Sequence, residues 1–139
     1  MRMDRFTTKL QEALQRAVDV AGELGHQRLE PEHIIFALLR QEDSMLIEVF
    51  DKLGFPSFTV IKRVEEFLKD LPSVSGSSAQ NHFSERTNTL LRRAAKEAHN
   101  FKDEYLSAEH ILLALLEDNE SVVTQALKTK GIDKEKVLM

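Results

Sequence analysis

The sequence predicts an all-α fold, an eight-helix bundle formed by two four-helix repeats that are related by a pseudo-twofold axis. Several segments of the 139 residues have apolar residues at spacings of three and four, whereas none alternates with period two between turn signals. Residues 29–39, LEPEHIIFALL, also recur as residues 106–116, LSAEHILLALL, at an offset of 77. Residues 6–62 align with residues 83–139 without a gap at 15 identical positions of 57, so a whole helical unit is duplicated.

Helix one of the first repeat is predicted from about Thr7 to Leu24. Thr8 and Gln11 have the spacing of a capping box, and Gly25 can supply the left-handed residue that ends the helix. Its apolar stripe has the spacing of one helix face. The stripe consists of Leu10, Leu14, Ala17, Val18, Ala21 and Leu24.

Three further helices complete the first repeat. Helix two begins at Pro31, because a missing N–H costs nothing at a first helical position. Helix three follows Ser44 as its N-cap and stops at Gly54, and helix four follows Ser57 as its N-cap and ends before Pro72.

A linker is predicted over residues 72–82. This stretch is rich in Ser and has almost no large apolar residues, which is typical of a flexible connection. It divides one domain, residues 1–139, into repeat one (6–71) and repeat two (83–139).

The second repeat has the same four helices. Ser84 is the expected N-cap of helix five, and helices six and seven start after Ser107 and Ser121. An eighth helix begins near Asp133 and is cut at Met139, so we expect the chain to be a fragment of a larger protein.

Helices two and six are apolar on more than one face, which is typical of a helix at the centre of a core. We therefore expect them to pack against each other across the pseudo-twofold axis. A groove would then lie where the repeats meet, with the loops before these two helices near the starts of helices one and five.

Composition and motifs exclude several classes of protein. The chain has no Cys, which excludes disulfides and thiolate chemistry and fits a cytoplasmic protein. The net charge of −4, with both signs mixed, and Tyr105 as the only Tyr or Trp argue against a nucleic-acid partner. No apolar run approaches the ~20 residues of a membrane span. There is also no P-loop and no HExxH motif.

Two Glu-His pairs, Glu32-His33 and Glu109-His110, are adjacent residues on a helix and point apart, so they make a poor metal or acid–base site. We expect both histidines to be structural residues packed where the repeats meet, and we predict neither a catalytic residue nor a metal site. The two glutamates allow two interpretations. Each could simply stabilise its helix N-terminus by about 0.3–1 kcal/mol. Both could instead be displayed beside the groove to bind Lys or Arg of a bound chain.

The segments MRMDRFTTKLQEAL, GHQRLEPEHIIFALL, LKDLPSVSG and YLSAEHILLALL resemble the N-terminal domain of the Clp AAA+ unfoldases. The resemblance covers essentially the whole chain and is strongest to the disaggregases of the ClpB type. It implies a pseudo-twofold eight-helix bundle tethered ahead of two ATPase rings and a coiled-coil middle domain in a cytoplasmic, homohexameric chaperone. Hexamer formation, ATP and magnesium would belong to those ATPase modules, so we expect this chain to be monomeric, without a cofactor and without enzymatic activity.

The resemblance also implies a function, the recognition of unfolded or aggregated polypeptide in the groove between the repeats. The polar residues implicated in the family match Thr7, Asp103 and Glu109 here. We add Glu32, the equivalent of Glu109, and Tyr105 as candidate substrate-binding residues.

The groove of the family has an apolar lining contributed by helix five. Here Arg93 and Glu97 fall on the corresponding face, which is at odds with a purely apolar groove.

An alternative is a domain that docks an adaptor protein or binds phosphoarginine, as in the ClpA and ClpC relatives. Glu32 and Glu109 match the glutamates that help to hold phosphorylated arginine in ClpC. An enzymatic interpretation would rest on the Glu-His pairs alone and is the weakest of the three.

Overall fold

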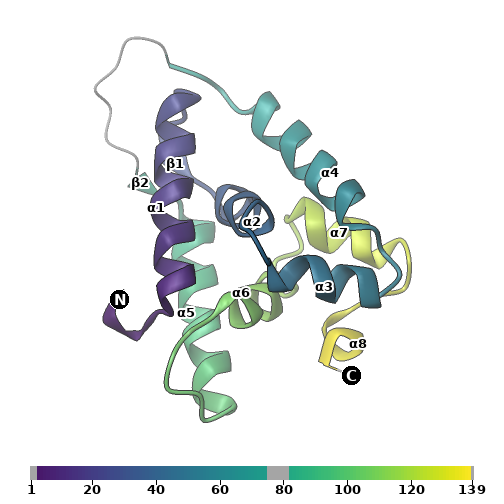
Figure 1. Cartoon of the computed structure of the whole chain (residues 1–139). Coiled ribbons are helices and arrows are strands. Elements are labelled where there is room, and N and C mark those ends of the chain that lie inside the picture. Colours follow the sequence, from purple (N-terminus) through teal and green to yellow (C-terminus); the bar gives the residue numbers. More distant parts are fainter. Residues whose placement is uncertain (1–2, 75–81, 139) are drawn as a thin grey trace.

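A computed structural model describes residues 3–74 and 82–138 of the chain, and almost all regular structure in them is helical. Figure 1 shows α2 and α6 in the middle of the molecule, with α1 and α5 on one side and α3, α4 and α7 on the other. The predicted all-α, eight-helix fold is therefore confirmed. In chain order the elements are a 3-10 turn (Met3–Arg5), α1 (Thr8–Glu23), β1 (Arg28–Leu29), α2 (Pro31–Leu39), α3 (Met45–Lys52), α4 (Ser57–Asp70), β2 (His82–Phe83), α5 (Glu85–Asn100), α6 (Ala108–Leu115), α7 (Val122–Lys128) and α8 (Lys134–Leu138).

The helices of the two repeats correspond at the offset of 77 that the sequence predicts. Both ends of α5 lie 77 positions after the ends of α1, and each of these helices has 16 residues. α6, α7 and α8 start 77 positions after α2, α3 and α4. The repeats differ most in their last helix, which has 14 residues in α4 and five in α8.

Each repeat pairs its first extended segment with a loop of the other repeat. Phe6, before α1, pairs in parallel with Leu106, before α6. Phe83 of β2, before α5, pairs in parallel with Leu29 of β1, before α2. Because Phe83 and Leu106 lie 77 positions after Phe6 and Leu29, the two pairings are pseudo-twofold equivalents. We call these segments the exchanged strands; they bring the loops before α2 and α6 next to the starts of α5 and α1, as predicted.

Two helix starts differ by one residue from the prediction. Thr7, not Thr8, is the N-cap of α1, and its side chain accepts a hydrogen bond from the N–H of Leu10. Pairing of the adjacent Phe6 with Leu106 keeps Thr7 extended, so the helix starts after it. Ser57 is the first residue of α4 rather than its N-cap, because the carbonyl of Pro56 already accepts from Val60 N–H.

The side-chain caps at Ser84 and Ser121 follow the prediction, whereas Ser44 is at the N-cap position of α3 without a side-chain hydrogen bond to the helix. Ser84 accepts from the N–H of Thr87, and Ser121 accepts from Val123 and Thr124. Side-chain caps of this kind satisfy N–H groups that have no partner inside the helix.

The central helices α2 and α6 contain the longest buried stretches. All residues of α2 except Phe36 are buried, as are residues 110–115 of α6, and the two helices contact each other. Their apolar side chains belong to one continuous core that also includes residues of α1, α3, α4, α5 and α7. Within the described ranges, no helix combines the length and apolar character needed to cross a membrane.

The predicted linker lies mostly outside the described residues, which omit residues 75–81. Its described start is fixed to the end of α1. The hydroxyl of Ser73 donates to the carbonyl of Leu24 at 2.8 Å, and Val74 N–H donates to the carbonyl of Gly25 at 2.9 Å. Gly25 has φ +72°, and a Cβ there would lie 2.7 Å from Ser73 Oγ and from the Val74 carbonyl oxygen. Only glycine permits this close approach without displacement.

Candidate functional site

One of the exchanged strands brings most of the predicted site residues to one region. Thr7 N–H donates to the carbonyl of Leu106 at 3.0 Å, and Leu106 N–H donates to the carbonyl of Arg5 at 2.8 Å. Leu106 lies between Tyr105 and the first turn of α6, which contains Glu109. The start of α1 is therefore fixed against the loop that contains the other candidates.

Asp103 is held in this loop by His110, a residue of α6. The side chain of His110 is 6% exposed, and its Nε2 lies 2.7 Å from Asp103 Oδ2. His110 Nδ1 accepts from the N–H of Ser107 at 2.9 Å, so the proton of the neutral ring is on Nε2 and is donated to Asp103. The Asp103 side chain is 51% exposed and can accept further hydrogen bonds from a bound molecule.

Glu109 is exposed in the first turn of α6, and no ion pair holds it within the described part of the chain. Two aromatic side chains are exposed on the loop before it, Phe101 at 51% and Tyr105 at 49%. The region thus combines accessible carboxylates with accessible aromatic surface. We call Thr7, Asp103, Tyr105 and Glu109 the acidic site.

Glu32 does not belong to the acidic site, contrary to the expectation of two equivalent displayed carboxylates. It is 1% exposed, and both its oxygens accept from the guanidinium of Arg86 in α5, at 3.2 Å and 3.0 Å. Burial raises the pKa of Glu32, while the hydrogen bonds from Arg86 act in the opposite direction. Glu32 therefore has an intramolecular partner and presents no free carboxylate.

Arg86 also pairs with two carboxylates of its own repeat, Asp118 and Glu120, and with Glu30 of repeat one. Its Nη2 lies 2.8 Å from Asp118 Oδ2, and weaker ion pairs reach Glu120 at 3.5 Å and Glu30 at 3.8 Å. The equivalent of Arg86 in repeat one is Lys9, whose Nζ bonds the backbone carbonyl of Glu42 instead. The repeats share a helical framework but differ in which glutamate is neutralised.

A second difference concerns the histidines. In repeat one, His33 Nε2 lies 2.8 Å from His26 Nδ1, where the equivalent pair in repeat two is His110 and Asp103. Glu30 N–H donates to His33 Nδ1 at 2.8 Å, so His33 donates through Nε2 to His26. Burial, and secondarily His26, lower the pKa of His33 to about 4, and burial lowers the pKa of His26.

Both His33 and His110 are buried at helix starts, at 0% and 5% exposure. Their side-chain hydrogen bonds stay within their own repeat. Within the described residues, no group of three or more His, Asp or Glu side chains could hold a metal ion.

One of the two charged residues expected on the groove face of α5, Glu97, is engaged within the fold. Glu97 is 7% exposed and forms an ion pair with Lys134 at the start of α8, and Arg93 is half-buried. The carboxylate of Glu97 therefore faces α8.

Sequence reasoning missed Arg86 and the link from His110 to Asp103. Arg86 bonds Glu32 across 54 positions, so no local pattern identifies the pair. The histidine link left a weak signal, because Asp103 and His26 each lie seven positions before the histidine of a Glu-His pair.

Comparisons with known proteins show the family and the fold. Residues 5–130 match the family model described as the Clp repeat (R) N-terminal domain. A relative named chaperone protein ClpB, from Porphyromonas gingivalis, is 38% identical over 116 residues, which is 84% of this chain and 13% of the relative. This chain spans about one seventh of the length of the curated relatives it matches, between 13% and 16%.

Two solved structures share the fold. The Hsp104 N-terminal domain from Candida albicans matches with a TM-score of 0.81 at 23% identity, covering 95% of this chain and 85% of that one. A ClpV N-domain in complex with a VipB peptide matches with a TM-score of 0.77 at 20% identity, covering 96% of this chain and 82% of that one.

Proposed function

Because this chain belongs to the Clp repeat N-terminal domain family, we propose that it is the substrate-recognition domain of a ClpB-type disaggregase. In this proposal it binds unfolded or aggregated polypeptide, and the ATP-dependent work belongs to other modules of a cytoplasmic, hexameric parent protein. The chain itself acts as a binding domain and not as an enzyme. The peptide complex of the structurally similar ClpV N-domain supports polypeptide binding by this fold.

The observation that supports the acidic site most directly is the exposure of Asp103, at 51% for its side chain, and of Glu109 beside the exposed rings of Phe101 and Tyr105. Unfolded clients expose apolar side chains together with Lys and Arg. The rings can pack against the apolar side chains, and the carboxylates can accept hydrogen bonds from the cations. Thr7 fixes the start of α1 against this surface through Leu106.

Binding through this surface should be weak and salt-dependent. A disordered client loses conformational entropy when it is ordered on the domain, which lowers the affinity. The carboxylates are exposed, so their attraction to a cation is screened by salt.

The proposal is tested by titrating the domain with a permanently unfolded protein, such as reduced and carboxymethylated lactalbumin. Asp103→Asn and Glu109→Gln should each weaken binding about two- to fivefold. Glu48→Gln is the matched control, because Glu48 is also an exposed glutamate in the first turn of a helix, α3. Equal affinities of all three variants and the unmodified domain would reject the acidic site.

A second candidate function is the binding of phosphoarginine or of an arginine presented by an adaptor. The Glu32–Arg86 pair supports it, because a guanidinium is held there by two hydrogen bonds to the first-turn glutamate. Glu109 occupies the equivalent position in repeat two, and its equivalent cation, Lys9, bonds elsewhere.

Titration with free phosphoarginine, followed by NMR, separates the two functions. Shifts centred on Glu109, and absent at Glu32, favour this second function. Client binding without any phosphoarginine shift favours the first.

A further inference from the structure

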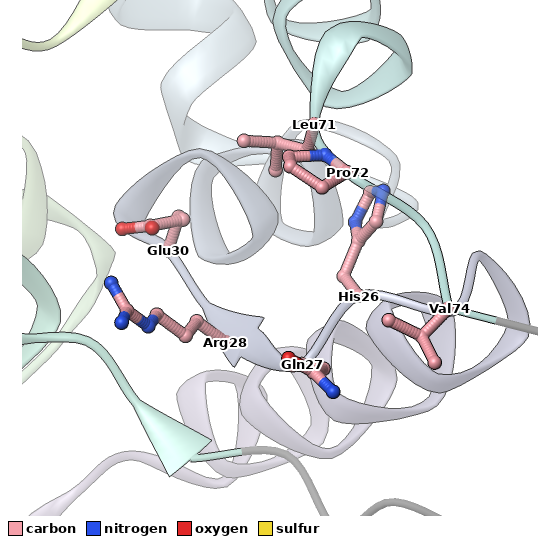
Figure 2. A pocket seen from close by; sticks show the side chains of 7 residues that line it. All are labelled: His26, Gln27, Arg28, Glu30, Leu71, Pro72 and Val74. Carbon is pink, nitrogen blue, oxygen red and sulfur yellow. The ribbon is translucent and has the colours of Figure 1, made fainter. Parts of the chain in front are cut away.

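A pocket of about 290 Å³ lies in repeat one, between the α1–α2 connection and the end of α4. Figure 2 shows His26 close to Pro72, with Val74 beside it and the side chains of Arg28 and Glu30 on the opposite side. None of the acidic-site residues lines it. The lining residues are His26, Gln27, Arg28, Glu30, Leu71, Pro72 and Val74.

His26 provides a hydrogen-bond donor in this pocket. The residue is only 6% exposed, and its Nδ1 accepts the proton of His33 Nε2 at 2.8 Å. The proton of the neutral His26 ring must therefore be on Nε2, which has no hydrogen-bond partner in the described part of the chain. Burial lowers the pKa of His26, which keeps the ring neutral near pH 7.

The wall next to His26 is apolar and is fixed in place. Leu71, Pro72 and Val74 follow the end of α4, and Val74 N–H and Ser73 Oγ bond the carbonyls of Gly25 and Leu24. This wall is preformed, so little conformational entropy is lost there when a ligand binds.

The charges around the pocket offset each other, because Glu30 and Arg28 both line it on the side away from His26. Glu30 keeps a carboxylate at the edge, 3.8 Å from Arg86, and its Oε1 is buried without a hydrogen bond. Arg28 is exposed and points in the same direction as Glu30, away from His26. The neutral donor of His26 suits a neutral acceptor, such as a backbone carbonyl, and the apolar wall disfavours a charged side chain.

We propose that this pocket is a second polypeptide-binding site, in which one apolar side chain packs on Leu71, Pro72 and Val74 while the adjoining backbone carbonyl accepts from His26 Nε2–H. The site does not depend on the acidic site, which lies in the loop before α6. Its volume holds one large aliphatic side chain and its peptide unit. Repeat two cannot form the same site, because Asp103, an acceptor, occupies the position of His26.

The probe is the capped peptide N-acetyl-Gly-Leu-Gly-amide, titrated into the isotopically labelled domain and followed by NMR. We expect a Kd on the order of a millimolar, which is usual for so small a ligand, with shifts centred on Gln27, Arg28, Leu71 and Val74. The capped peptide with Glu in place of Leu should bind at least about tenfold more weakly. Shifts that are spread over the domain, or equal for the two peptides, would overturn the proposal.

Two variants test the named groups. His26→Asp copies the pair of repeat two, so His33 keeps an acceptor while the pocket loses its donor; we expect about a tenfold weaker Kd. Val74→Asp changes a partly exposed wall residue, keeps the backbone bond to Gly25 and should abolish detectable binding. Glu48→Gln, which changes an exposed glutamate of α3 outside both sites, is the control and should leave the peptide affinity unchanged. Unchanged affinity in Val74→Asp, or in a folded His26→Asp, would rule the site out.

Discussion

Arg86 forms two hydrogen bonds to Glu32 across the junction of the repeats, and Glu32 is 1% exposed. Removing one partner of a buried ion pair leaves the other charge buried without compensation, which costs about 3–5 kcal/mol. We expect Arg86→Ala to lower the free energy of unfolding by that amount, measured in urea at neutral pH. Lys9→Ala, at the equivalent exposed position, should cost less than about 0.5 kcal/mol.

The double variant Arg86→Ala/Glu32→Gln should recover part of the loss, because it removes the uncompensated charge. Equal stabilities of Arg86→Ala and Lys9→Ala would contradict the buried-pair interpretation.

Gly25 and Gly54 form a matched pair for a test of the linker contact. Both have positive φ, +72° and +77°, but a Cβ would meet Ser73 and Val74 only at Gly25. Gly54→Ala should cost about 1 kcal/mol from backbone strain alone. Gly25→Ala should cost at least about 1 kcal/mol more, because Ser73 and Val74 must move.

Urea unfolding of the two glycine variants measures this difference. The same displacement should weaken binding of the capped leucine peptide in Gly25→Ala and leave it intact in Gly54→Ala. Similar losses of stability and of binding in both variants would argue against a pocket wall that the contact of Gly25 with Ser73 and Val74 holds in place.

The His33–His26 pair makes stability depend on pH. Burial first, and His26 second, lower the pKa of His33 from 6.5 to about 4 in the folded protein. Between these values the unfolded chain binds more protons than the folded one, so stability is full above pH 6.5 and falls as the pH falls toward 4. The loss is roughly 3 kcal/mol for His33, and the lowered pKa of His26 acts in the same direction.

Urea midpoints between pH 4 and 7 measure this dependence. The raised pKa of Glu32 opposes it at the acidic end of the range, so the comparison with a variant is needed. His26→Asp supplies a carboxylate to His33 and should flatten the slope. If the His26→Asp variant kept the wild-type slope of stability against pH, groups other than the His33–His26 pair would cause the pH dependence.

Thr7 and Ser84 are the equivalent N-caps of α1 and α5. Substituting each of them distinguishes an effect on stability from an effect on client binding. Each side chain accepts from an N–H three positions later, Leu10 and Thr87. Thr7→Ala and Ser84→Ala should therefore each cost about 1 kcal/mol. Only Thr7→Ala should also weaken client binding, because Thr7 belongs to the acidic site and Ser84 is buried at the start of α5. Loss of client binding in both variants would point to stability as the common cause.

The helical framework was predictable because its evidence is local and repeated. Apolar spacing, caps such as Ser84 and Ser121, and stops such as Gly54 all act within a few residues, and the second repeat gives each of them again. The error at Thr7 has a non-local cause. Thr7 and Thr8 can both cap a helix, and the choice depends on pairing of Phe6 with a loop 100 positions later.

The candidate site was harder to predict for the same reason. Glu32 and Glu109 have nearly identical surroundings in sequence, so symmetry suggested that both are displayed. Their difference depends on Arg86, an arginine where repeat one has Lys9. The guanidinium can hold a carboxylate by two parallel hydrogen bonds, and a lysine cannot. One substitution between the copies thus makes one glutamate structural and leaves the other available.

The exchanged strands have a consequence for each half of the chain taken by itself. A single four-helix unit, produced without its sister, would leave the backbone at Phe6 and Leu29 with no pairing partner. A second copy of the same unit would provide both partners at once and close a symmetric homodimer. The protein can therefore be regarded as such a homodimer with its two subunits fused into one polypeptide.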